Sequence, residues 1–166
     1  MKKNATIGHL EHGIVEVADE YRAIAEEDEQ AALLLIHARK YRNAVYFLVQ
    51  AMEKHVRATI FGLVNPNTGY FQDRTRTHNL DDLLDFLVEI TSSDPTVQGQ
   101  VRSQLHGFIL GGIRFGKMHN DLRYPQYSVR HKTYSVLRVT ARDAEVTFQR
   151  LQTLKQFLKD MQKLTR

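Results

Sequence analysis

Residues 41–54, YRNAVYFLVQAMEK, decide the fold that the sequence predicts. They lie within a segment from Ala31 to about Leu63 in which apolar side chains recur every three or four residues, the pattern of an amphipathic helix. The face that we expect to be buried carries Ile36, Ala44, Phe47, Leu48, Ala51, Met52 and His55. The helix ends at Asn65-Pro66-Asn67-Thr68-Gly69, which is typical of a turn.

An N-terminal helix is predicted by the same spacing of Ile7, Leu10, Ile14, Val17, Tyr21 and Ile24. The acidic run at 26–29 either closes this helix or opens the next one, and the second arrangement suits the helix dipole better. We therefore expect an extra acidic helix within residues 1–30, followed by a core bundle over 31–166.

Three further helices are predicted toward the C-terminus. Asn79 or Thr77 caps the first, which runs to about Ile90 and stops at 91–95. The second runs from about Thr96 to 109, and its end is weakened by Gly111, Gly112 and Gly116.

Residues 120–139 have the character of an irregular loop, in which 136–139 is the best candidate strand. The last helix starts at Thr140, and its buried face carries Ala144, Thr147 or Phe148, Leu151, Leu154, Leu158 and Met161. Together the segments predict one all-α domain over 1–166, an antiparallel up-down bundle of about five helices.

Composition narrows the class of protein. The chain has 166 residues, 42% of them hydrophobic, which suits a single compact domain. It has no cysteine, which excludes disulfides, thiolate zinc sites and cysteine nucleophiles. No apolar run approaches the roughly 20 residues that span a bilayer, and the polar start does not resemble a signal peptide. We expect a soluble cytoplasmic protein with no membrane partner.

Charge is distributed unevenly along the chain. Residues 1–30 hold eight acids against three Lys or Arg, whereas residues 114–142 hold seven Lys or Arg against one acid, Asp121. A basic stretch of this density attracts phosphate. The alternative is that it pairs with the acidic first helix of the same chain or of a partner chain.

The histidines raise the question of a metal site. His9, His12 and Glu16 would share one helical face and could supply three ligands. A solvated face near the terminus is the alternative that we favour, so we expect neither a metal nor another cofactor.

The run Arg114-Phe115-Gly116-Lys117-Met118-His119-Asn120-Asp121-Leu122-Arg123-Tyr124-Pro125 carries the groups that metal-free RNA cleavage needs. Histidine moves protons near neutral pH, and arginine offers a permanent fork to phosphate. On an unbroken helix Arg114 and His119 would point about 140° apart. They can share a phosphate only if the helix breaks between them or if two chains contribute.

Three stretches resemble the HEPN domain family (higher eukaryotes and prokaryotes nucleotide-binding), and the resemblance spans roughly 38–160. Residues 41–54 look like the family's early helix, and His78-Asn79-Leu80 followed by Leu83-Leu84 looks like the opening of the next. Arg123-Tyr124-Pro125 resembles the loop before the last helix. The resemblance implies a bundle of four to five helices, commonly a homodimer. Many members are metal-independent ribonucleases marked by Arg, four to six residues, then His, which Arg114 and His119 match.

The resemblance implies that Arg114 holds the scissile phosphate and that His119 acts as general base or acid on single-stranded RNA. The products would be a 2′,3′-cyclic phosphate and a 5′-hydroxyl. The remaining candidates for RNA or phosphate binding are Lys117, Asn120, Arg123, Tyr124, Arg130 and Lys132. In this family such a nuclease is usually a toxin or a component of antiviral defence, with a neutralising antitoxin as partner.

Other roles stay open for these residues. His119 could cap the fourth helix, and Arg114 could pair with Asp121 or with an acid of the first helix. Arg123 and Tyr124 could order the loop, and Glu53-Lys54 could be helix surface or a dimer contact. His55 and His106 are expected to be structural.

A different class of function also fits the chain. The domain could bind a nucleotide or a partner protein without catalysis, working with a separate nucleotidyltransferase. A scaffold, in which the acidic helix and the basic loop mediate self-association, is a third reading.

Overall fold

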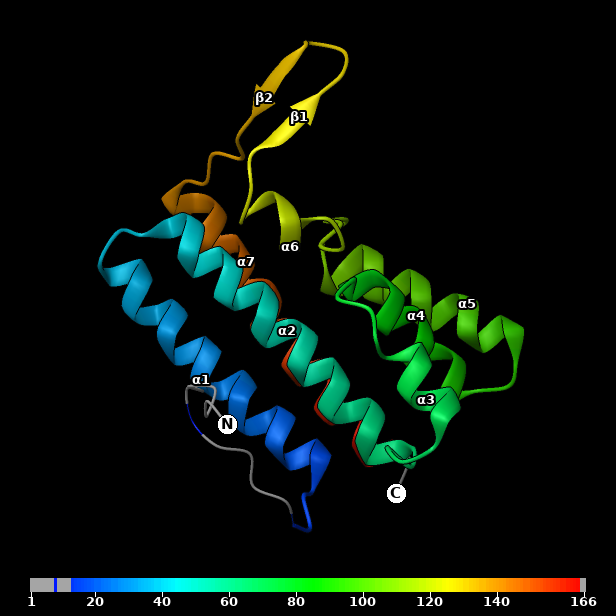
Figure 1. The fold of residues 1–166 in the computed structure, drawn as a ribbon. Coiled ribbons are helices and arrows are strands. Elements are labelled where there is room, and N and C mark those ends of the chain that lie inside the picture. The colour runs from blue at the N-terminus through cyan, green and yellow to red at the C-terminus, as the bar shows by residue number, and fades with distance from the viewer. Residues whose placement is uncertain (1–7, 9–12, 165–166) are drawn as a thin grey trace, which may run out of the picture.

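The computed structural model describes residue 8 and residues 13–164, which form a helical bundle (Figure 1). Its three long helices are α1 (Val17–His37), α2 (Tyr41–Leu63) and α7 (Ala141–Leu164). Both α1 and α7 pack along α2. The shorter elements are α3 (Gly69–Arg74), α4 (Leu80–Thr91), α5 (Pro95–Gln104), the π-helical turn Leu105–Ile109, α6 (Met118–Asp121) and the strands β1 (Gln126–Ser128) and β2 (Thr133–Ser135).

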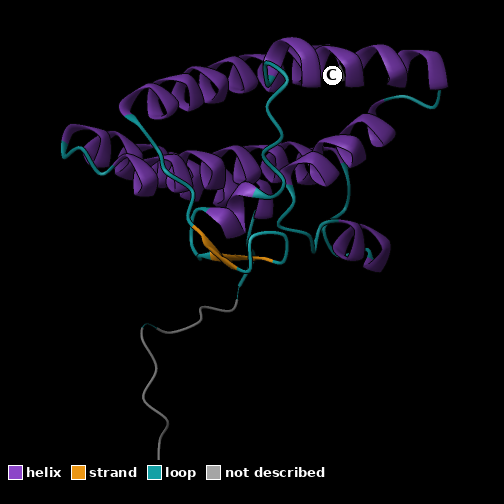
Figure 2. Cartoon of the chain, turned by 90° about the horizontal axis from the view of Figure 1, so that it is seen from above, coloured by secondary structure: helices purple, strands orange, loops and turns teal. Residues whose placement is uncertain are grey.

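The all-α prediction is confirmed, with seven α-helices in the described residues in place of about five. The two short helices α3 and α6 account for the difference. The predicted irregular loop at 120–139 contains the hairpin β1–β2, in which Tyr127 is paired with Tyr134. The strand candidate at 136–139 was wrong, because the pairing lies just before it. Figure 2 shows this hairpin as the one stretch of strand in the described chain.

The single helix predicted from 31 to 63 was wrong, because the chain reverses at 38–40. Arg39 adopts a left-handed conformation with φ 57°. Its N–H donates to the Ile36 carbonyl at 2.9 Å, and the Lys40 N–H donates to the Leu35 carbonyl at 2.8 Å. This is a Schellman ending, in which glycine is the usual residue at the left-handed position. The reversal brings α1 back along α2 as an antiparallel neighbour (Figure 1).

The acidic run at 26–29 lies inside α1, so neither of its predicted positions was right, and a boundary after residue 30 falls within that helix. The run is partly satisfied by the bundle. Lys54 pairs with Asp28, and Lys155 pairs with Glu29 at 2.6 Å. The predicted start of the first helix was also too early, because α1 begins at Val17 and Ile14 is 98% exposed. Ile7 and Leu10 lie outside the described residues.

Side-chain caps mark the starts of α4 and α5. Asn79 is the N-cap of α4 and accepts from the Asp81 N–H at 3.0 Å, while the Thr77 hydroxyl accepts from the Asn79 N–H at 3.0 Å. Asp94 caps α5, which starts with Pro95 at its first position. Gly111 and Gly112 follow the π-helical turn with positive φ and stop it, as predicted.

The core sits where α2, α4 and α7 meet. On α7 it includes Ala144, Leu151, Leu154 and Leu158, which confirms the predicted face. The segment after α5 adds Leu105, Leu110 and Phe115, and so fixes the chain that leads to α6. No helix in the described part of the chain is both long and apolar enough to cross a membrane.

Candidate active site

His119 lies on the short helix α6 and faces α2. Its Nδ1 is 3.0 Å from Gln50 Nε2, and its Nε2 is 3.2 Å from Arg123 Nη1. The four-residue spacing of His119 and Arg123 places both side chains on one face of the helical turn. The end of α6 is tied to α2 by Arg42, whose Nε donates to the Leu122 carbonyl at 2.7 Å.

A second imidazole, His78, stacks on His119. The ring centroids are 5.0 Å apart and the planes differ by 8°. His78 stands just before the N-cap of α4, and its Nδ1 is 3.1 Å from Glu53 Oε1. Because an ionised carboxylate only accepts hydrogen bonds, His78 Nδ1 is the donor, which fixes the orientation of the ring. The His78 side chain is 65% exposed, so this stacked pair is open to a substrate.

Glu53 and Arg57 form a buried ion pair beneath His78. Their side chains are 5% and 8% exposed, and Arg57 Nε and Nη2 reach Glu53 Oε1 at 3.1 and 2.9 Å. The same guanidinium donates to the carbonyls of Thr75 and Thr77. These bonds hold the loop between α3 and α4 against α2, and so place His78 beside His119.

Hydrogen-bond chemistry determines which nitrogen of His119 carries the proton. A guanidinium only donates, so His119 Nε2 accepts from Arg123 and is unprotonated. The neutral ring then carries its proton on Nδ1, and Gln50 must turn its amide oxygen toward it. The two ends of an amide have the same shape, so their assignment follows from the hydrogen bonds.

The surroundings also keep His119 neutral. Burial lowers its pKa below the ordinary value of 6.5, and the nearby charges of His78, Arg123 and Lys54 act in the same direction against the opposing effect of Glu53. A neutral imidazole with its Nε2 lone pair beside a guanidinium has the arrangement of a general base next to an anion-binding group.

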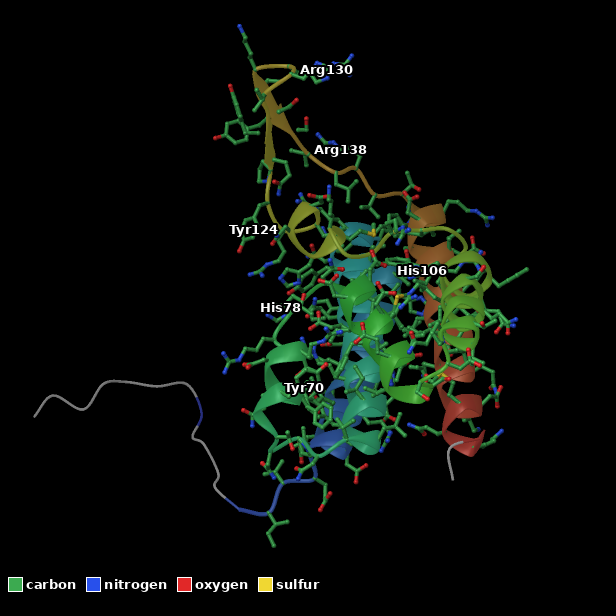
Figure 3. The ribbon with its side chains drawn as sticks, turned by 90° about the vertical axis from the view of Figure 1, so that its right-hand side faces the viewer. Tyr70, His78, His106, Tyr124, Arg130 and Arg138 are labelled. Atoms are coloured by element: carbon green, nitrogen blue, oxygen red, sulfur yellow. The ribbon has the colours of Figure 1, made fainter. Side chains whose placement is uncertain are left out.

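A cavity of about 440 Å³ opens beside His78, between α1, α2 and the loop after α3. It is lined by Tyr21, Gln50, Glu53, Lys54, Arg57, Phe61, Gln72, Thr75, Arg76 and His78. Figure 3 shows His78 at one edge of the molecule, between Tyr124 on the hairpin side and Tyr70 on the α3 side. His78, which lines the cavity, therefore lies between the hairpin and α3 along this edge.

The sequence model described as "HEPN domain" matches residues 18–161. The chain belongs to the HEPN domain family. Comparisons with curated proteins and with solved structures gave no match. The matched range contains the histidine cluster, by which we mean Gln50, Glu53, His78, His119 and Arg123. HEPN domains include ribonucleases and nucleotide-binding modules.

The Arg114 side chain forms no hydrogen bond or ion pair with His119 in the described structure. The preceding helical turn already ends at Ile109, so no continuous helix joins the two residues, and Arg114 lies in the irregular segment before α6, between the partly buried Ile113 and the buried Phe115. It is exposed and makes no ion pair with Asp121 or with any other described residue. The guanidinium that contacts His119 is that of Arg123.

The remaining predicted phosphate-binding residues lie on the same end of the domain. Lys117 and Asn120 flank His119 and are exposed. Arg123 covers the Tyr124 ring, with 5.0 Å from its Cζ to the centroid. The exposed residues Arg130 and Lys132 belong to the turn of the hairpin, which projects from the bundle (Figure 3).

The structure also bears on the non-catalytic roles that the sequence left open for several residues. The His119 ring contacts Gln50 and Arg123, so it does not serve as a cap of the preceding helix. Glu53 is buried, so the prediction of helix surface was wrong for it. His55 is buried, and His106 is half-buried beside Asp85, as expected of structural histidines.

Of the three candidate metal ligands, only Glu16 lies within the described residues. His9 and His12 lie outside the described residues. Among the residues that are described, no group of three His, Asp or Glu side chains is arranged to hold a metal ion.

Sequence reasoning missed His78, Gln50 and Glu53 as members of the site. All three stand in the stretches that resemble HEPN domains, and that was the available signal. Their convergence depends on contacts across 69 positions for Gln50 with His119 and 25 for Glu53 with His78, which no local spacing reports.

Proposed function

We propose that this HEPN domain is a metal-independent endoribonuclease that cleaves single-stranded RNA at the histidine cluster. The observation that carries the proposal is the contact of 3.2 Å between His119 Nε2 and the Arg123 guanidinium, in which the nitrogen is assigned as the acceptor. The contact supports the proposal because attack by a neighbouring 2′-hydroxyl needs a base and a phosphate-binding cation at one point.

In this mechanism Arg123 turns from His119 Nε2 to the phosphate, and the freed Nε2 lone pair takes the proton of the 2′-hydroxyl as its oxygen attacks the adjacent phosphorus. The bond from phosphorus to the 5′-oxygen breaks, and this oxygen receives a proton from the protonated form of His78. The products are a 2′,3′-cyclic phosphate and a 5′-hydroxyl. Arg123 stabilises the negative charge that builds on the phosphorane, and Arg114 binds the same strand from the irregular segment before α6 or from a second subunit.

The basic hairpin supports a single-stranded substrate. Residues 123–138 carry Arg123, Arg130, Lys132 and Arg138 and no acid. Tyr127 and Tyr134 are 56% and 67% exposed, so their rings are available to stack on bases. Together with Lys117 and Asn120 they would guide the backbone toward His119.

The test is cleavage of an end-labelled single-stranded RNA in excess EDTA. Wild type is compared with the His119→Ala, Arg123→Ala and Arg114→Ala variants. Removing the base is expected to slow cleavage at least about 100-fold. The matched control is Arg142→Ala, which removes a 74% exposed arginine on α7 and should leave the rate unchanged. Equal rates in wild type and His119→Ala would reject the mechanism.

The lack of a hydrogen bond between Arg114 and His119 in the described structure favours a second candidate function, a non-catalytic module that binds a nucleotide or a partner such as a nucleotidyltransferase. A folded wild type that binds RNA or nucleotide but cleaves none of several RNAs would establish this alternative.

The biological role that we propose is that of a toxin or antiviral defence component held in check by an antitoxin. Expression of the wild type should then arrest growth, whereas His119→Ala should not. Growth arrest by both proteins would show that toxicity does not depend on cleavage by His119.

A further inference from the structure

The cavity beside His78 has a free acceptor at its base. Glu53 Oε1 accepts from Arg57 at 2.9 and 3.1 Å and lies 3.1 Å from His78 Nδ1. Glu53 Oε2 accepts no hydrogen bond from the described residues, and it is not among the side-chain atoms that are sealed from solvent without a partner. Glu53 lines the cavity, and we take Oε2, the oxygen without a partner, as the one that a ligand there would meet.

The chemistry of the free oxygen defines what the cavity can bind. The donors of Arg57 are directed at Glu53, Thr75 and Thr77. A carboxylate only accepts, so a ligand that reaches Glu53 must bring an N–H or O–H donor of its own. A buried acceptor of this kind discriminates strongly against ligands that lack the donor.

We infer that this cavity is a nucleobase subsite that selects adenine, cytosine or guanine over uracil by accepting a hydrogen bond from the base amino group at Glu53. The inference rests on the proposed function, because it takes the substrate to be RNA. Uracil has no amino group, and the two carbonyl oxygens beside its N3–H would face the carboxylate. It is therefore the base that this site should bind most weakly.

The other walls of the cavity suit a nucleotide. Tyr21 and Phe61 stack on each other with centroids 5.7 Å apart and planes 13° from parallel, which gives an aromatic wall where α1 meets α2. Lys54, which pairs with Asp28, and Arg76, which is 77% exposed and pairs with Asp73 at 3.6 Å, add two cations to the lining. A volume of about 440 Å³ lies within the range of small-molecule sites.

Position connects this subsite to the cleavage centre. His78 lines the cavity and also stacks on His119 at 5.0 Å. A nucleotide whose base lies against Glu53 would therefore have its phosphate next to the two imidazoles. The base identity beside the scissile phosphate would be read by Glu53, on α2, while the reaction takes place at α6.

The experiment has a binding arm that does not depend on cleavage. Calorimetric titration of the full chain with the 3′-monophosphates of adenosine, cytidine, guanosine and uridine should give uridine at least about tenfold weaker binding, the size expected for one charge-assisted hydrogen bond. Glu53→Gln should remove this difference among the four nucleotides. The matched control, Glu89→Gln, alters a 41% exposed glutamate paired with Arg74 and should keep it.

A cleavage arm maps the sites cut in a randomised single-stranded RNA. Selective binding without cleavage would reject the nuclease proposal and leave the subsite standing. Cleavage without any base preference, together with equal binding of the four nucleotides or none, would overturn the subsite alone. Thermal melting shows whether Glu53→Gln is folded. If it is unfolded, two other measurements decide the matter. One is the order of affinity of the wild type for the four nucleotides, and the other is Arg76→Ala, which should weaken the binding of all four.

Discussion

His55 makes the stability of the bundle depend on pH. It lies on α2, is 9% exposed, and its Nε2 is buried without a hydrogen-bond partner in the described structure. Burial is the main reason that its pKa is lowered from 6.5 to about 4. The positive charges of Lys155 and Arg22 lower it further, and Glu29 opposes them.

The sign follows from which state binds the proton. The unfolded chain takes up a proton on this ring below pH 6.5, whereas the folded chain takes it up only near pH 4. The stability that His55 contributes is thus fully present above pH 6.5 and is lost as the pH falls toward 4. One pH unit in this window corresponds to about 1.4 kcal/mol, so about 2 kcal/mol should be lost between pH 7 and pH 5.

The assay is urea unfolding followed by far-UV circular dichroism at pH 7 and pH 5. His55→Gln removes the titration, and other groups that titrate in this range do so in both proteins, so the difference between the two losses isolates His55. His131→Gln, at an exposed position of the hairpin turn, is the matched control. Its free energy of unfolding should fall between pH 7 and pH 5 by as much as that of wild type. An equal loss in wild type and His55→Gln would refute the reasoning.

Three further predictions concern the site. The lowered pKa of His119 places the acidic limb of the pH profile of kcat/KM below pH 6.5. Arg123→Ala should move this limb to higher pH, because the Arg123 cation is one of the groups that lower the pKa of His119. A limb that does not move would argue against coupling between Arg123 and His119. Arg57→Met leaves a buried carboxylate with one partner fewer and should cost about 3–5 kcal/mol in calorimetric unfolding, whereas a cost below about 1 kcal/mol would mean that the pair does not hold the loop. Replacing both Arg130 and Lys132 by Ala should reduce the salt dependence of RNA binding, measured by anisotropy, by about 1.4 in slope, and an unchanged slope would place the strand elsewhere.

The helices could be predicted wherever a capping residue or a proline marks the boundary. Asn79 at the start of α4 and Asp94-Pro95 at the start of α5 are such signals, and both helices were found. The reversal between α1 and α2 has none, because Arg39 occupies a left-handed position that usually signals itself by glycine. Packing of α1 along α2 stabilises a turn that the local sequence does not predict.

The site could be predicted only in its local part. His119 stands out in a basic run, and Arg123 follows it at the four-residue spacing of neighbours on a helix. Arg114 was chosen for its place in the family pattern, but its exposed side chain forms no hydrogen bond or ion pair with the described residues, while the adjacent Phe115 is buried. Gln50, Glu53 and His78 join the cluster only through the packing of α2 against α6 and the loop before α4.

The ion pairs of α1 bear on what the basic segment 114–142 is for. One reading of the sequence balanced this segment against the acidic first helix of the same chain. In the described structure Asp28 pairs with Lys54 and Glu29 with Lys155, so these acids of α1 are engaged by α2 and α7. Arg142 pairs within its own helix, with Glu145.

The other six basic residues of the segment form no ion pair with the described residues; they are Arg114, Lys117, Arg123, Arg130, Lys132 and Arg138. The positive charge at the hairpin end of the bundle is therefore left unneutralised by these acids, next to the only imidazole pair that stacks in the described chain. An anion from outside the chain is what this arrangement suits, and a nucleic-acid backbone supplies such charges at regular spacing.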